Sequence, residues 1–242
     1  MLRRSRELFA DILRQTDLVL LALCAAASLF GVLMVASATR YMHTWRLVAV
    51  QSVALLLGVV LYLVISQIDL NDLCKYWKWI FLVGVVCILL LVTPLGIADN
   101  TGNRAWLDFP FLPVKVQPAE IVKLTLTLVL AKQLVWLKEN RDLSSIPSIL
   151  FLAAHLGVIF VLYYKVSSDM GSALVFLFIF ACMCFVGGVA LRWFLLGGLV
   201  GGLAFWAMWD LNKIPSYMKL RFQVLFDHSL DPQDTGWQQT RS

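Results

Sequence analysis

Charged residues are scarce in this sequence. Asp, Glu, Lys and Arg together make up 14% of the 242 residues, whereas 60% are hydrophobic and the mean hydropathy is +0.81. An ordinary soluble domain carries about 25% charged residues. The composition therefore excludes a typical soluble domain and indicates a membrane protein.

The side chains that build metal sites are also few. The sequence has three His and five Cys, and it contains no Cys-x-x-Cys pair. His155 stands alone in an apolar run, where a hydrogen-bonded packing residue is the simpler interpretation and a ligand is the alternative. We expect no metal site built by the protein and free, buried thiols.

The positive net charge does not form one patch. The formal charge is +5, but the Lys and Arg residues cluster at the ends of apolar segments. That distribution is a signal of membrane topology, and it argues against nucleic-acid binding. Internal repeats and glycine-rich phosphate-binding motifs are lacking as well.

Long apolar runs dominate what remains. Runs of about 18 residues or more can cross about 30 Å of hydrocarbon as helices, and these runs lack the alternation of spanning strands. We predict an all-α, polytopic helical membrane protein with about seven transmembrane helices, at residues 18–38, 47–66, 79–97, 117–137, 148–164, 170–190 and 193–211. Residues 1–17 would precede the transmembrane bundle at 18–211, and 212–242 would follow it.

The cationic residues suggest an orientation. With the N-terminus in the cytoplasm, ten Lys and Arg lie in inner segments and five in outer loops before residue 212, which agrees with the positive-inside rule. Residues 98–116 and 212–242 would then be extracytoplasmic. Ala36-Ser37-Ala38 resembles a signal-peptidase site, but the apolar stretch before it is longer than that of a signal peptide.

One stretch between the third and fourth spans combines polar side chains with a helix start. Pro118 suits the first position of a helix, and Gln117, Glu120, Lys123 and Thr127 fall within roughly 120° of one face. The structural interpretation is a capping carboxylate with an i,i+3 ion pair. The functional one, which we favour, is a charged pair near the outer interface that faces a cavity or the bundle interior.

Three further polar residues leave alternatives open. Arg104 could bind a phosphate in bidentate fashion or only extend to the interface. Trp106 could be functional or act as an aromatic anchor at headgroup level. Asp169 could be functional, or it could simply cap the sixth span, as Ser168 could.

The order of these motifs is similar to that of a known family. Four stretches resemble the SEDS family (shape, elongation, division and sporulation), the RodA and FtsW-like peptidoglycan glycosyltransferases. They are Asn103–Leu107, Gln117–Lys123, Ser167–Leu174 and Arg221–Ser242. The third stretch keeps Asp169 and Gly171 but loses the family's Gln-Pro. In the last, Asp234 and Arg241 replace the usual Gly and Gln.

The resemblance implies a bacterial plasma-membrane enzyme that polymerises lipid II, the undecaprenyl-pyrophosphate-linked disaccharide, and works with a single-pass class B penicillin-binding protein. Arg104, Trp106 and Lys123 would bind substrate, and Gln117, Glu120, Lys123 and Asp169 would form a polar network. The family's catalytic base would lie beyond Ser242, as would three more helices, so the catalytic residue is unknown and we expect a truncated chain. No cofactor is expected, although a divalent cation could accompany the pyrophosphate. The alternatives are a lipid II flippase or transporter, and an inactive binding partner.

Overall fold

The computed structural model describes residues 16–40, 45–98, 103–111, 114–211, 219–220 and 223–224. Most of the expected cytoplasmic segment, residues 1–17, and most of the expected outer loop, residues 212–242, lie outside these ranges. The chain forms two compact units, Met1–Trp79 and Ile80–Ser242. Each is described by itself below.

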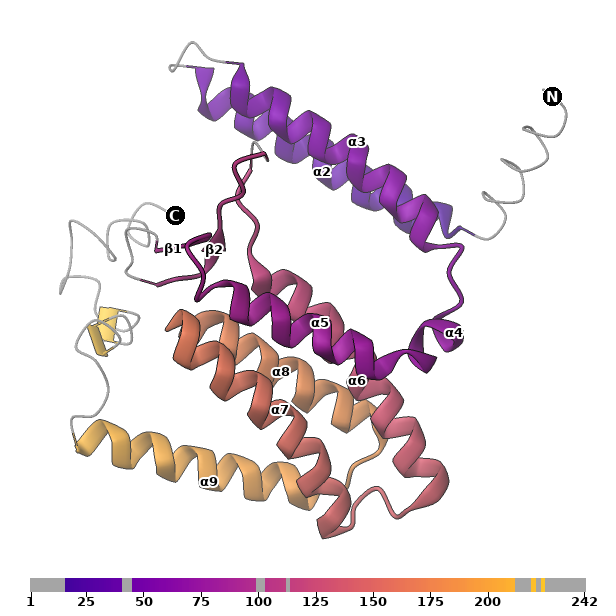
Figure 1. Ribbon diagram of the computed structural model, residues 1–242, viewed down its shortest axis with the longest axis vertical. Helices are drawn as coiled ribbons and strands as arrows, with labels where there is room; N and C mark the ends of the chain where they lie inside the picture. The colour runs from indigo at the N-terminus through magenta and orange to yellow at the C-terminus, as the bar shows by residue number, and fades with distance from the viewer. Residues whose placement is uncertain are drawn as a thin grey trace, which may run out of the picture. The chain divides into compact units, whose positions relative to one another are not determined.

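The first unit is a helical hairpin. Helices α2 (Leu18–Ala38) and α3 (Arg46–Ile65) lie side by side (Figure 1), and the short α4 (Leu70–Lys75) follows. Asp17 caps α2, because its Oδ1 accepts hydrogen bonds from the amides of Val19 and Leu20. At the same end, Tyr62 donates its hydroxyl to the Asp17 carbonyl at 3.2 Å.

The second unit carries the remaining elements, including all of α5 except its first three residues. Helix α5 (Trp77–Leu90) leads into a two-stranded antiparallel sheet of β1 (Gly96–Ile97) and β2 (Trp106–Leu107), in which Gly96 faces Leu107 and Ile97 faces Trp106. Helices α6 (Pro118–Asn140), α7 (Ile146–Ser167), α8 (Met170–Gly187) and α9 (Leu191–Asp210) follow (Figure 1).

Apolar side chains of α5, α6, α7 and α8 form the core of this unit. The main cluster includes Ile88, Val122, Ile159, Tyr163 and Phe176, all at most 1% exposed. A close approach joins α5 to α6, since a Cβ at Gly84 would lie 2.5 Å from the Thr125 hydroxyl oxygen. By contrast, α9 buries none of its own residues and is attached at its start, where the Trp193 indole donates to the Ser144 carbonyl.

Each of the seven predicted spans contains a helix. Within the described residues, five helices are long and apolar enough to cross a membrane: α2, α3, α7, α8 and α9. Helix α6 has 23 residues but carries Glu120, Lys123 and Lys132 along it, with Lys138 and Glu139 in its last turn. The all-α architecture predicted from the sequence is therefore confirmed.

The predicted third span, 79–97, was wrong at its C-terminal end. Helix α5 ends at Leu90 after 14 residues, which is about 21 Å at 1.5 Å per residue. Pro94 has no amide hydrogen and disfavours helical geometry at the residue before it. Thr93 closes the end by donating its hydroxyl to the Leu90 carbonyl.

The cysteine prediction was correct in part. Cys24, Cys74, Cys87, Cys182 and Cys184 are all free, as expected, but Cys24 and Cys182 are exposed on their helices and only Cys184 is buried. An apolar sequence context therefore did not distinguish the exposed side of a helix from its packed side.

Candidate functional site

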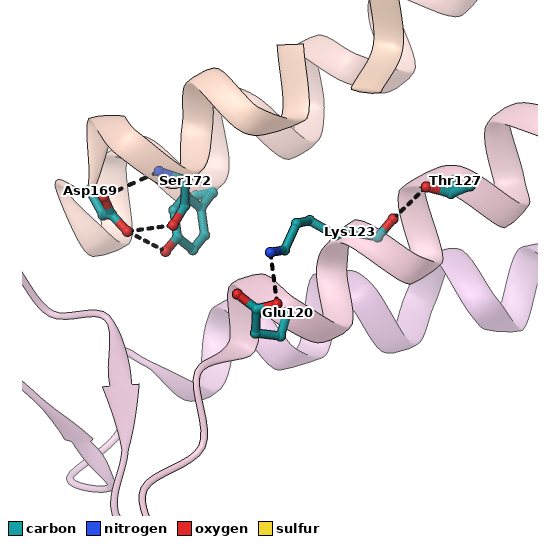
Figure 2. A network of polar contacts seen from close by, with 6 residues as sticks. Glu120, Lys123, Thr127, Asp169 and Ser172 are labelled. Atoms are coloured by element: carbon teal, nitrogen blue, oxygen red, sulfur yellow. Dashed lines mark hydrogen bonds and ion pairs between the residues drawn. The ribbon is translucent and has the colours of Figure 1, made fainter. Parts of the chain in front are cut away.

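The predicted charged pair forms at the start of α6. Pro118 occupies the first turn, and Gln117 precedes it as the N-cap without a side-chain capping bond. The Lys123 ammonium lies 2.7 Å from Glu120 Oε2, one helical turn away, and Thr127 donates its hydroxyl to the Lys123 carbonyl (Figure 2). The i,i+3 geometry expected from the spacing is thus present.

The environment of the pair differs from the expected cavity. The Glu120 side chain is 63% exposed and that of Lys123 is 30% exposed, so the pair lies at the surface of this unit. Solvent-accessible ion pairs contribute about 0–1 kcal/mol to stability. The ion pair therefore contributes little to the stability of the fold, and stability does not explain why two charged residues lie at this position.

Asp169 lies at the junction of α7 and α8. Ser168 ends α7 in the left-handed region with φ 58°, which turns the chain so that Asp169 becomes the N-cap of α8. Its Oδ1 accepts from the Ser172 amide at 3.3 Å, and its Oδ2 accepts from the Ser172 hydroxyl at 2.6 Å and the Tyr163 hydroxyl at 3.2 Å. Both carboxylate oxygens therefore have donors.

Tyr163 and Ser172 were not among the residues selected from the sequence. Tyr163 is fully buried, and its ring packs edge-on against Phe176 at 5.1 Å between centroids. Asp169 is a residue type that favours the N-cap position, where its carboxylate accepts from an amide two or three residues later, so its contact with Ser172 is local. Nothing in the sequence indicates Tyr163, because its contact with Asp169 depends on how α7 ends.

The predicted network of Gln117, Glu120, Lys123 and Asp169 does not form as one unit, because among the described residues only Glu120 and Lys123 of these four bond to each other through their side chains. Figure 2 shows the Lys123 side chain extending from α6 toward the start of α8, where Asp169 and Ser172 lie. In the described part of the chain, however, no hydrogen bond or ion pair joins Asp169 to Glu120, Lys123 or Gln117. The two polar groups lie on neighbouring helices, since α6 packs against α8.

Arg104 and Trp106 belong to the segment between α5 and α6. The Arg104 guanidinium donates from Nε to the Gly96 carbonyl and from Nη2 to the Thr93 carbonyl, both at 3.0 Å. Trp106 is half-buried in β2 opposite Ile97. Arg104 thus directs its guanidinium at protein carbonyls, and Trp106 lies in the strand that follows it.

His155 has the packing role that the sequence indicated. Its Nδ1 is hydrogen-bonded to Gln133 Oε1 at 2.9 Å, and its ring packs edge-on against Phe81. Its Nε2 is buried and has no hydrogen-bond partner in the part of the chain that the structure describes. Among the described residues, no group of three or more His, Cys, Asp or Glu side chains is arranged to hold a metal ion.

Known proteins resemble this chain along most of its length. A probable peptidoglycan glycosyltransferase FtsW from Saccharophagus degradans is 30% identical over 238 residues, which are 95% of this chain and 59% of the relative. A second FtsW, from Nitrosococcus halophilus, is 28% identical and is covered to 58%. The chain thus spans about three fifths of the length of these relatives.

Solved structures show the same architecture. A chain of a peptidoglycan synthase complex that coordinates polymerization and crosslinking matches with a TM-score of 0.74 and 29% identity, covering 90% of this chain and 61% of that one. The rod shape determining protein RodA of Thermus thermophilus matches with a TM-score of 0.61 and 29% identity over 76% of this chain and 58% of that one.

The matching family model, described as a cell cycle protein and named for FtsW, RodA and SpoVE, extends over residues 15–242. With its apolar helices, its motifs and these relatives taken together, the chain is a multi-pass membrane protein and belongs to the FtsW/RodA/SpoVE family, the SEDS proteins.

Proposed function

We propose that this chain forms part of a lipid II polymerase of the bacterial plasma membrane. The observation that carries the proposal is the Glu120–Lys123 pair at the start of α6, in a chain that matches the family over residues 15–242. The names of the relatives support the reaction class, since they are peptidoglycan glycosyltransferases.

The reaction needs a base and positive charge. A sugar hydroxyl attacks the anomeric carbon of a lipid-linked disaccharide, the new glycosidic C–O bond forms, and the bond to the pyrophosphate oxygen breaks. The base takes the hydroxyl proton, and cations stabilise the charge that develops on the leaving group. We expect the residue that acts as this base to lie beyond Ser242.

Within this chain, Lys123 is the cation best placed for that task. Among the described residues its ammonium pairs with Glu120 alone, and the side chain is 30% exposed, so a pyrophosphate oxygen can reach it. Glu120 holds the ammonium near the helix start, and the half-buried Trp106 offers an apolar surface to the lipid-linked sugar. Asp169 stands on the neighbouring helix as a fixed carboxylate. A divalent ion, where one takes part, would be held mainly by the substrate.

Orientation and partner belong to the same proposal. The positive-inside bias places the N-terminus in the cytoplasm and the start of α6 at the outer face. The similarity to a chain of a peptidoglycan synthase complex supports a crosslinking partner, which we infer to be a single-pass class B penicillin-binding protein.

Substitution of one lysine tests the site. We continue the chain with the remaining residues of its Saccharophagus relative and compare Lys123→Met with Lys132→Met, a half-buried lysine farther along α6. We expect polymerisation of labelled lipid II to fall at least tenfold in Lys123→Met only, because a lost charge contact in the transition state costs roughly 10² or more. Stability should change by less than about 1 kcal/mol.

Equal activity in the two variants would remove Lys123 from the site. If Lys123→Met lost its activity because the protein unfolds, the role of the pair would be structural and not substrate binding.

A further inference from the structure

We propose that Arg104 is a positioning residue, which holds the segment between α5 and α6 in place through backbone carbonyls and thereby fixes the start of α6. The guanidinium bonds to Thr93 and Gly96, both of which follow α5. This role differs from that of a phosphate ligand, because Nε and Nη2 point at the protein itself.

The connection from Arg104 to α6 is short and continuous. Arg104 is followed by β2, in which Leu107 is buried in the core. Leu107 exchanges two backbone hydrogen bonds with Val116, at 2.8 and 2.9 Å, and Val116 is two residues before Pro118. A displacement of Arg104 is therefore transmitted through Leu107 to the helix start that carries Glu120 and Lys123.

The backbone of Arg104 makes a third attachment. Its amide donates to the carbonyl of Ser167 at 3.0 Å. Ser167 is fully buried and is the last residue of α7, two positions before Asp169. One residue thus connects the exit of α5, the end of α7 and the strand that leads to α6.

The packing around the guanidinium requires a glycine. A Cβ built at Gly96 would clash with the Leu91 carbonyl oxygen and would lie 3.0 Å from Arg104 Nε. The turn after α5 is therefore closed tightly around the arginine. Lysine carries one nitrogen in place of the planar guanidinium fork, so it cannot reproduce donation from two nitrogens to two carbonyls.

Hydrogen exchange of the 242-residue chain tests this role without any enzyme assay. The variants are Arg104→Lys, which keeps the charge, Arg104→Gln, which removes it, and Lys115→Gln, which removes an exposed charge from the same segment. We expect about tenfold faster exchange in both Arg104 variants at the amides of residue 104, Leu107, Asp108 and Val116. Each variant loses at least one side-chain hydrogen bond to the carbonyls of Thr93 and Gly96. The Lys115 variant should exchange as the parent does.

Two exchange results would overturn the proposal. Unchanged exchange in Arg104→Lys would mean that charge alone suffices. Loss of protection throughout α6, α7 and α8 in both Arg104 variants would make the arginine a general requirement for folding.

A kinetic comparison in the extended chain separates positioning from ligand binding. Positioning predicts that Arg104→Lys lowers kcat at nearly constant KM for lipid II. A raised KM at constant kcat, with normal exchange, would identify Arg104 as a substrate ligand. The kinetic comparison depends on the proposed function, whereas hydrogen exchange does not. The two experiments therefore distinguish failure of the positioning role from failure of the proposed function.

Discussion

At the scale of single residues, sequence reasoning succeeded where the contact is local. Glu120 and Lys123 are three positions apart on one helix, so their ion pair followed from the helical repeat. The acceptors of Arg104 are backbone carbonyls, which have no signature in the sequence. The contact of Tyr163 with Asp169 depends on the left-handed turn at Ser168. The sequence pattern did not predict that turn.

Tyr163 gives a residue-scale prediction. Tyr163→Phe keeps the ring against Phe176 but removes one of the three donors to Asp169, so we expect a loss of about 1 kcal/mol in unfolding free energy. Reversible unfolding of the purified chain in mixed micelles measures it. The control is Tyr164→Phe, at a half-buried neighbour. Equal stability of the two variants would show that the Tyr163 hydroxyl contributes nothing.

At the scale of elements, apolar run length predicted where helices form better than where they end. Helices α2, α3, α7 and α9 lie within two or three residues of the predicted bounds. The error at α5 arose because the apolar residues continue to Ile97, while Pro94 and the pairing of Gly96 with Leu107 turn the chain into a strand. In this segment, strand pairing and proline determined where the helix ends, although the residues that follow are apolar.

The direction of α6 is a prediction at this scale. In a cysteine-free version of the chain, a single cysteine at Lys115, before α6, should react with a membrane-impermeant maleimide in intact cells. One at Asn140, the last residue of α6, should react only after the membrane is opened. This follows from the excess of positive charge assigned to the inner segments. Labelling at Asn140 alone in intact cells would invert the orientation.

At the scale of the whole molecule, the membrane class and the family could be predicted from the sequence, since both rest on composition and on the order of motifs. The details of the candidate site could not, because two polar groups that the sequence suggested as one network are formed on neighbouring helices with separate partners. The chain covers 59% of the length of its FtsW relative from Saccharophagus.

The most direct test of the account is a gel assay for glycan strands with purified protein and labelled lipid II. The 242-residue chain is compared with the version continued to the length of its relatives. We predict polymer from the extended chain and none from the 242-residue chain, because general-base catalysis contributes roughly 10²–10⁴-fold and we expect the base beyond Ser242. Transfer of lipid II across the membrane without polymer from the extended chain would contradict the account. Polymer from the 242-residue chain would place the base within these residues.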